Sequence, residues 1–325
     1  MDQHYVSYNK NHKEGYVYNS YSSDLYLKHV VSSIMTLRRY DTERPVALYC
    51  CKEHKKLIES YKLTPLFSQI HILPEENRSI PGFKHNLEKF MPFQQNLFLD
   101  SDIVWCRNPD FLWTRLSTYK YTITGTQTAD IFFGGHKGLY VLADVLMQRR
   151  KKTLQKFGLS FLSRVQAGMI YAADKTLTKR VSDAAKEYFS QKNETHFVSR
   201  TTEKGRTDES CEWSLAMAMS ALNLQVFEWL NGFESPQLDY ISDYTTHDKN
   251  FNKVSCLYYS NRFVYDLKGI RHPFFRKVLI KCISLLPGKG DHFYVTPYCL
   301  HFGWLKEKKV LNRFSEKSWN ELTKS

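Results

Sequence analysis

Two carboxylates stand between apolar runs in residues 96–105, which read NLFLDSDIVW. The bulky apolar residues on either side indicate one strand that is buried on at least one face. Because side chains alternate along a strand, Asp100 and Asp102 are expected on the same face. Two buried carboxylates repel and raise each other's pKa unless a cation lies between them. The pattern therefore predicts a Mg²⁺ or Mn²⁺ site, and the alternative is a polar turn that merely ends the strand.

The composition is that of a folded protein with a large core. The chain has 325 residues, of which 42% are hydrophobic and 15% aromatic, and this excludes a disordered protein. No apolar run reaches the roughly 18–20 residues of a membrane span, and the first residues contain no apolar signal region. Seven cysteines without C-x-x-C spacing do not indicate a disulfide framework. We therefore expect a cytoplasmic location.

The net charge of +13 favours anionic ligands such as nucleic acid, acidic lipid headgroups or phosphorylated small molecules. Two segments carry much of the excess, QRRKKTLQK (148–156) and RKVLIK (276–281). Residues 273–287 mix Phe, Leu and Ile with Arg and Lys, as interfacial helices do. This segment is expected either as a helix with weak membrane contact or as a C-terminal core helix.

The first third of the chain alternates between expected strands and helices. Strands are expected at 15–21, 45–50, 69–73 and 96–105, and helices at 24–39, 52–62 and 83–91. This alternation predicts an α/β fold with a mostly parallel central sheet and helices on both faces. Ligands of such sheets bind at the carboxyl ends of the strands, where Asp100 and Asp102 lie.

The rest of the chain is less regular. Strands are expected at 121–126, 129–135, 167–173 and 225–230, and helices at 139–157, 208–223 and 273–287. Residues 232–262 show no clear period. We expect a single domain over 1–325, with a nucleotide-sugar-binding core at about 15–230. The C-terminal elaboration, about 231–325, is expected to return to the active site.

The chain contains none of the common phosphate-binding or hydrolytic signatures. It has neither G-x-G-x-x-G after the first strand nor G-x-x-x-x-G-K-[ST], and it has no H-E-x-x-H and no G-x-S-x-G. A phosphate ligand must then be held by a metal ion and basic side chains instead of a glycine-rich loop.

Residues 83–113, FKHNLEKFMPFQQNLFLDSDIVWCRNPDFLW, resemble the donor-site segment of the glycogenin-like retaining glycosyltransferases of family 8, which have the GT-A fold. Six positions stand at matching spacings: Lys84, Asp100, Asp102, Asn108, Asp110 and Leu112. VQAGMIYAAD (165–174) is similar to the family's Asn-(Ser/Ala)-Gly strand, with Gln166 in place of Asn. LHFGWLKEKK (300–309) is similar to its His-x-x-Gly-x-x-Lys segment. His301 and Lys306 are the counterparts, although Gly303 and the lysine each come one residue early.

The resemblance implies a metal-dependent, retaining hexosyltransferase. The donor would be a UDP-sugar, and the acceptor a glycan, a lipid-linked glycan or another hydroxyl compound. Mn²⁺, or else Mg²⁺, would lie between Asp100, Asp102 and His301. Lys84 and Lys306 would add positive charge where the diphosphate departs.

The end of the first strand would hold the nucleoside in this interpretation. Tyr18, Asn19 and Ser20 stand there, and Ser101 would reach the ribose through its backbone. Tyr26 is expected either to stack on uracil or to pack in the core.

Two further residues are expected to take part in catalysis. Glu212 is favoured as the carboxylate that faces the sugar, and Gln166 is assigned to the catalytic site with it. Asp208 and Glu209 suit a helix N-terminus instead. Two other functions stay open, a sugar-nucleotide nucleotidyltransferase and a basic module that binds nucleotides or nucleic acid. In the leading interpretation no nucleic acid partner is expected.

Overall fold

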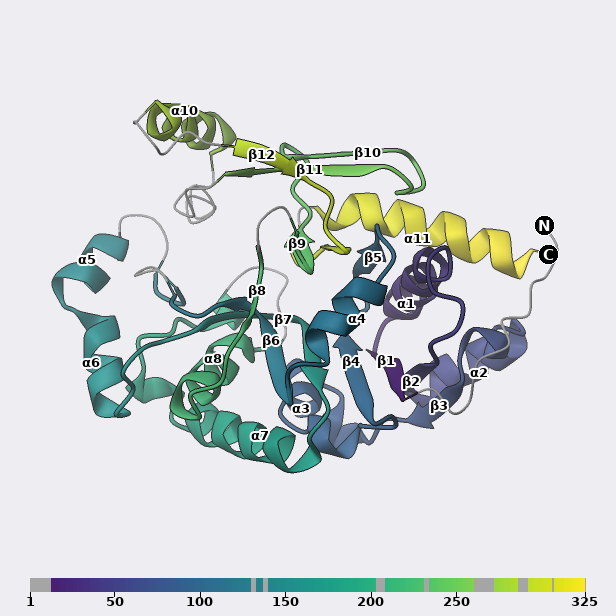
Figure 1. Cartoon of the computed structure of the whole chain (residues 1–325), viewed down its shortest axis with the longest axis horizontal. Helices are drawn as coiled ribbons and strands as arrows, with labels where there is room; N and C mark the ends of the chain where they lie inside the picture. The colour runs from purple at the N-terminus through teal and green to yellow at the C-terminus, as the bar shows by residue number, and fades with distance from the viewer. Residues whose placement is uncertain are drawn as a thin grey trace.

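The computed structural model describes residues 13–129, 133–136, 140–202, 208–230, 234–259, 272–285, 292–305 and 307–324. A seven-stranded sheet with the order β3-β2-β1-β4-β7-β6-β8 forms its centre (Figure 1). These strands are β1 (Glu14–Ser20), β2 (Val46–Cys50), β3 (Gln69–Ile72), β4 (Gln95–Leu99), β6 (Tyr121–Thr126), β7 (Arg164–Ala172) and β8 (Phe227–Glu228). All neighbours pair in parallel except that β7 is antiparallel to both β4 and β6. The predicted α/β class with a mostly parallel central sheet is confirmed.

Helices cover both faces of this sheet (Figure 1). On one face, α1 (Asp24–Leu37) packs against α11 (Lys308–Thr323), and on the other α7 (Lys175–Ser190) packs against α8 (Glu212–Ala221). The alternation of strand β1 explains the two layers, since Tyr16 and Tyr18 join the core cluster of α1. Val17, between them, joins the cluster that contains Trp213 of α8.

A small second sheet brings the C-terminal part of the chain back to the centre. Its order is β5-β13-β9, with β5 at Ile103–Trp105, β13 at Cys299–His301 and β9 at Gln237–Asp239. In this sheet His301 lies opposite Ile103 on one side and Asp239 on the other. A third sheet is antiparallel and contains β10 (Thr245–His247), β11 (Val254–Tyr259) and β12 (His292–Val295).

The remaining helices are short. They are α2 (Lys52–Ser60), α3 (Ile80–Lys84), α4 (Asp110–Leu116), α5 (Tyr140–Leu146), α6 (Arg149–Lys156) and α10 (Pro273–Ser284). The helices expected at 24–39, 52–62, 208–223 and 273–287 are confirmed as α1, α2, α8 and α10, each shorter than predicted. Among the described residues, every helix is too short or too polar to cross a bilayer.

The single strand expected at 96–105 is wrong, and this changes the reason why its aspartates meet. β4 ends at Leu99, β5 begins at Ile103, and the two strands belong to different sheets. Asp100 and Asp102 therefore lie in the turn where the chain leaves one sheet for the other. The turn, rather than alternation along one strand, sets the directions of the two side chains.

Two predicted helices are also interrupted. The helix expected at 139–157 is divided into α5 and α6, because Gln148 adopts a left-handed conformation with φ of +51°. The helix expected at 83–91 is wrong in its bounds, because α3 begins at Ile80 and ends at Lys84, and only a 3₁₀ turn at Leu87–Lys89 follows it. Of the strand expected at 129–135, residues 130–132 lie outside the described residues, and the remaining four residues form no strand.

Candidate functional site

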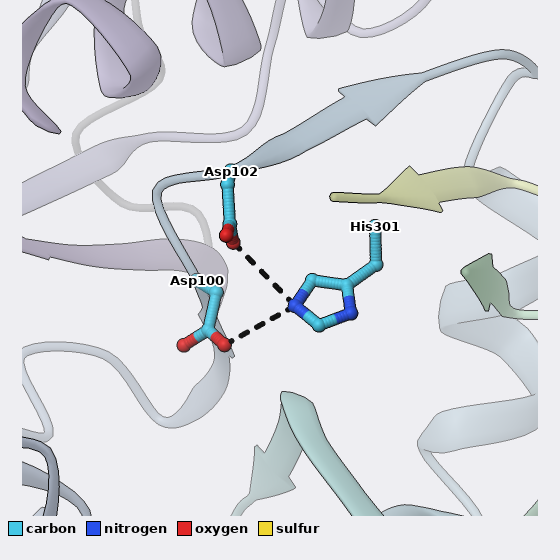
Figure 2. A group of neighbouring side chains, drawn as sticks. All are labelled: Asp100, Asp102 and His301. Carbon is cyan, nitrogen blue, oxygen red and sulfur yellow. Dashed lines mark ion pairs between the residues drawn. The ribbon is translucent and has the colours of Figure 1, made fainter. Parts of the chain in front are cut away.

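The three side chains predicted to share a cation converge at one point (Figure 2). One donor atom from each of Asp100, Asp102 and His301 lies within 4.8 Å of the other two. The Nε2 atom of His301 is 3.5 Å from Asp100 Oδ2 and 3.5 Å from Asp102 Oδ1. Asp100 follows β4 and Asp102 precedes β5, while His301 ends β13. The turn between β4 and β5 and the end of β13, which are far apart in the sequence, therefore meet at the carboxyl edge of the central sheet.

A lysine contacts the second oxygen of each carboxylate. Lys84 Nζ is 2.6 Å from Asp100 Oδ1 and also donates to the carbonyl oxygen of Ala167 at 2.8 Å. Lys308 Nζ is 2.8 Å from Asp102 Oδ2. Each carboxylate thus has one oxygen on a lysine and the other facing His301. Lys306, the predicted lysine, lies outside the described residues, and Lys308 was not predicted.

These contacts decide the charge of the cluster, in which Asp102 and His301 are buried and Asp100 is half-buried. Burial alone would raise the pKa of Asp100, but Lys84 and His301 hold that pKa below its ordinary value. Burial opposes ionisation of Asp102 too, yet Lys308 and His301 lower its pKa well below the usual range. Burial would lower the pKa of His301, but the neighbouring Asp102, Asp100 and Asp239 raise it well above its ordinary value. Both carboxylates are therefore ionised and positive charge gathers around them.

Asp239 and two further side chains fix the orientation of the imidazole ring. His301 Nδ1 lies 2.9 Å from Asp239 Oδ1, and Trp304 donates its indole N–H to Asp239 Oδ2 at 2.8 Å. Gln166 donates its amide to the same Oδ1 of Asp239, and its Nε2 is 2.8 Å from His301 Nδ1. Because Nδ1 is engaged in this way, Nε2 is the atom presented to Asp100 and Asp102. A carboxylate behind a histidine is a common arrangement at metal centres.

The donor set fits a divalent cation. An ion about 2.1 Å from its ligands separates neighbouring donors by roughly 3 to 3.6 Å at angles between 90° and 120°. The 3.5 Å distances from His301 Nε2 to the two carboxylates match that spacing. Two carboxylates with one imidazole nitrogen suit Mn²⁺ better than Mg²⁺, which prefers oxygen ligands.

Two of the residues predicted to contact the nucleoside are covered by helices. Tyr18 is wholly buried, and its hydroxyl lies 3.0 Å from Ser33 Oγ of α1. Ser20 is 1% exposed, and its Oγ lies 2.9 Å from His54 Nδ1 of α2. The helices that follow β1 and β2 thus cover the side chains of Tyr18 and Ser20, and the assignment of these two residues to the donor site stays a prediction.

Other residues at this edge remain accessible. Tyr26 is 39% exposed, and the Nζ atom of Lys308 lies 5.8 Å from the centre of its ring, so the core alternative for Tyr26 is wrong. Asn19 and Ser101 are half-buried, and their donor contacts stay predictions. Tyr21, directly after β1, was not predicted. Burial, followed by the charges of Asp208 and Asp100, raises the pKa of its phenol.

The two predicted catalytic residues lie on either side of β7. Glu212 begins α8, and its Oε1 accepts from the backbone N–H of Ala167 at 3.3 Å. Its negative charge also contributes to the raised pKa of Lys84, which burial alone would lower. Gln166 contacts Asp239 and the side of His301 that faces away from the carboxylates. Catalytic roles for both residues stay predictions.

A pocket opens beside Gln166 and Asp239. Its walls combine polar, aliphatic and aromatic side chains, and the aromatic ones, Trp229, Tyr244 and Tyr258, come from the less regular second half of the chain. The guanidinium carbon of Arg164, another wall residue, lies 5.2 Å from the centre of a Trp229 ring. A ligand in this pocket would contact the residues that orient His301.

Comparison with known proteins shows likeness only at the level of structure, since no family model and no curated protein matches the chain. The galactosyltransferase LgtC, in complex with donor and acceptor sugar analogs, is 11% identical with a TM-score of 0.49, over 96% of this chain and 95% of LgtC. The glycosyltransferase GlyE of Streptococcus pneumoniae is 13% identical with a TM-score of 0.49, over 97% of this chain and 63% of GlyE. Mouse xyloside xylosyltransferase 1 is 11% identical with a TM-score of 0.42, over 69% of this chain and 87% of that protein. Because these TM-scores lie below 0.5, the fold assignment rests on the strand pairing described above.

Proposed function

We propose that the chain is a metal-dependent glycosyltransferase, similar to the glycogenin-like family 8 enzymes, that moves a hexose from a UDP-sugar to a hydroxyl acceptor with retention. One observation carries the proposal. Asp100, Asp102 and His301 meet at the carboxyl edge of a mostly parallel sheet, and Lys84 and Lys308 each contact one of the carboxylates. In such sheets this edge is where nucleotide ligands bind.

The residues of the cluster have complementary tasks in this proposal. Asp100, Asp102 and His301 would hold Mn²⁺, which when bound neutralises the diphosphate of the departing UDP. Lys308 adds a fixed positive charge beside Asp102, where negative charge develops on the leaving group. Asp239 accepts from His301 and keeps its Nε2 turned toward the carboxylates.

The rest of the site would orient the two sugars. Tyr26, exposed beside Lys308, offers a ring on which uracil can stack. Glu212, which accepts from the N–H of Ala167, is proposed as the carboxylate beneath the transferred hexose. The pocket that includes Trp229, Tyr244 and Tyr258 is proposed to hold the acceptor, because aromatic faces pack against the apolar faces of sugar rings.

Release of UDP tests the proposal directly. The full chain is incubated with UDP-glucose, UDP-galactose or UDP-N-acetylglucosamine, with Mn²⁺ or with a chelator, and free UDP is measured. We expect Mn²⁺-dependent release from one donor, and a loss of at least about 100-fold in Asp102→Asn. The matched control is Asp183→Asn, since Asp183 forms exposed ion pairs with Lys179 and Lys186 on α7.

Each outcome has a defined meaning. Release that continues undiminished in Asp102→Asn, while thermal unfolding shows a folded variant, would refute the metal-dependent transferase. Formation of pyrophosphate from UTP and a sugar phosphate, without UDP release, would instead identify a nucleotidyltransferase. Loss of activity in Asp183→Asn as well would show that the effect is not specific to the cluster.

A further inference from the structure

Helix α10 presents an apolar face to solvent. Five residues of the helix share this face with Leu285, which directly follows the helix, and all six are exposed: Phe274, Phe275, Val278, Leu279, Cys282 and Leu285. At 3.6 residues per turn, their positions span roughly 140° around the helix axis. Phe274 is 65% exposed and Phe275 59%, whereas large apolar side chains in a core helix are buried. The sequence left open a core helix here, and for these side chains that alternative is wrong.

Positive charge borders the apolar face. Lys277 and Lys281 are exposed on the same helix, and Lys277 Nζ lies 3.6 Å from Asp243. The whole chain carries a net charge of +13. Two copies of such a chain repel each other, whereas an anionic surface attracts each copy. Charge therefore favours an anionic partner for this face over a second copy of the chain.

A second exposed apolar patch lies at the same end of the molecule. Around α5, Tyr140 is 72% exposed, Leu146 81% and Met147 54%. The exposed residues Lys151 and Lys152 follow directly on α6. In Figure 1, α5 and α10 both lie toward one end of the longest axis, away from the labelled chain termini. Exposed apolar and basic side chains thus occur together at two places on that end.

We infer that α10, together with the end of α5, docks on a bilayer surface rich in anionic phospholipid. Helices with an apolar face and a basic border lie in the plane of such interfaces, with the apolar side chains at the boundary with the acyl chains. Lys277 and Lys281 then contact lipid phosphates, since each basic residue near an anionic leaflet adds to the attraction. The inference does not rest on the proposed function, because it uses none of the residues of the metal cluster.

Sedimentation with vesicles tests this inference. The full chain is mixed at low salt with vesicles of equimolar phosphatidylcholine and phosphatidylglycerol, or with vesicles of phosphatidylcholine alone. We expect binding to the anionic vesicles that weakens as salt is added. The double variant Phe274→Ser/Phe275→Ser is expected to bind at least about tenfold more weakly, because two aromatic anchors are lost. Phe111→Ser is the matched control, because Phe111 is 54% exposed on α4.

A second pair of variants tests the role of charge. Lys277→Gln/Lys281→Gln is expected to bind anionic vesicles several-fold more weakly, whereas Lys179→Gln/Lys186→Gln on α7 binds as the wild type does. Absence of wild-type binding, or equal binding by wild type and the double Phe variant, would overturn the inference. A dimer of the wild type that the double Phe variant abolishes, without vesicle binding, would assign the face to a second copy and also overturn it. Thermal unfolding verifies that each variant is folded.

Discussion

At the scale of single residues, the candidate site gives each oxygen of its two carboxylates a different partner. Asp100 contacts Lys84 through Oδ1 and faces His301 through Oδ2. Asp102 contacts Lys308 through Oδ2 and faces His301 through Oδ1. A buried carboxylate with only one such neighbour would keep an oxygen without compensation. The arrangement therefore stabilises two adjacent negative charges and leaves their inner oxygens available to a cation.

Lys308 provides the first prediction at this scale. Replacing it with Ala removes the cation that contacts Asp102, and we expect the rate of UDP release to fall about 100-fold. Lys309→Ala is the matched control, since Lys309 is the next residue and is exposed. The rate is measured at saturating donor and Mn²⁺. Equal rates in the two variants would show that Lys308 serves only the structure.

Asp239 provides the second prediction. In Asp239→Asn the side chain keeps its shape and can still accept from His301 Nδ1, but it loses the negative charge behind the ring. We expect the affinity for Mn²⁺, measured by calorimetric titration, to fall roughly 10- to 100-fold. The control is Asp243→Asn, since Asp243 is an exposed acid four residues further along the chain that pairs with Lys277. An unchanged affinity in Asp239→Asn would mean that Gln166 and packing alone orient the imidazole.

At the scale of secondary-structure elements, the position of His301 depends on glycines in the adjoining segments. Gly168 lies in β7, and a Cβ atom there would be 3.2 Å from His301 Nε2. Gly303 follows β13, and a Cβ atom there would be 2.6 Å from His301 Cε1. The ring itself is fixed by Asp239 and Gln166, so it has little freedom to move aside. Space around the imidazole thus requires Gly303, and a Cβ atom at Gly168 would press on the same ring.

Gly303→Ala tests this dependence on space. We expect the displaced ring to reduce Mn²⁺ affinity by at least about tenfold, since ligand geometry is lost, while the fold persists. Gly158→Ala is the control, for which we expect the opposite pattern of effects. Gly158 has φ of +62°, and a Cβ atom at this position would meet no other atom within 4 Å. The substitution should therefore cost about 1 kcal/mol of stability through backbone strain and leave metal binding unchanged. Normal Mn²⁺ affinity in Gly303→Ala would contradict the argument.

At the scale of the whole molecule, the sequence predicts the central sheet better than the surroundings of the site. The bulky strands and amphipathic helices of the first third repeat over enough residues to show their period, and most of them are found as predicted. Asp239 could not be predicted, because β9 has only three residues and acquires its place by pairing with β13. The sequence indicated Lys308 only weakly, because it is one of several lysines after Gly303. Its position as the first residue of α11 brings it to Asp102.

Two buried histidines predict how the free energy of unfolding of the whole chain changes in acid. His85 is 3% exposed and bonded to Ser214, and His196 is 8% exposed and bonded to Thr153. Burial lowers the pKa of each to about 4, whereas an unfolded chain has a histidine pKa of about 6.5. Between these values only the unfolded state takes up the proton, so the free energy of unfolding falls as the pH falls.

The expected loss is about 3 kcal/mol for each histidine between pH 6.5 and pH 4, and almost none of it occurs above pH 7. Glu209 does not contribute to this window. Burial would raise its pKa, but hydrogen bonds from Lys192, Ser199 and two backbone N–H groups lower it to about 2, so its effect lies below pH 4.5. Denaturant unfolding at a series of pH values measures the slope. His85→Gln and His196→Gln should each flatten it, His272→Gln on the exposed surface should not, and an unchanged slope in the double variant would refute the assignment.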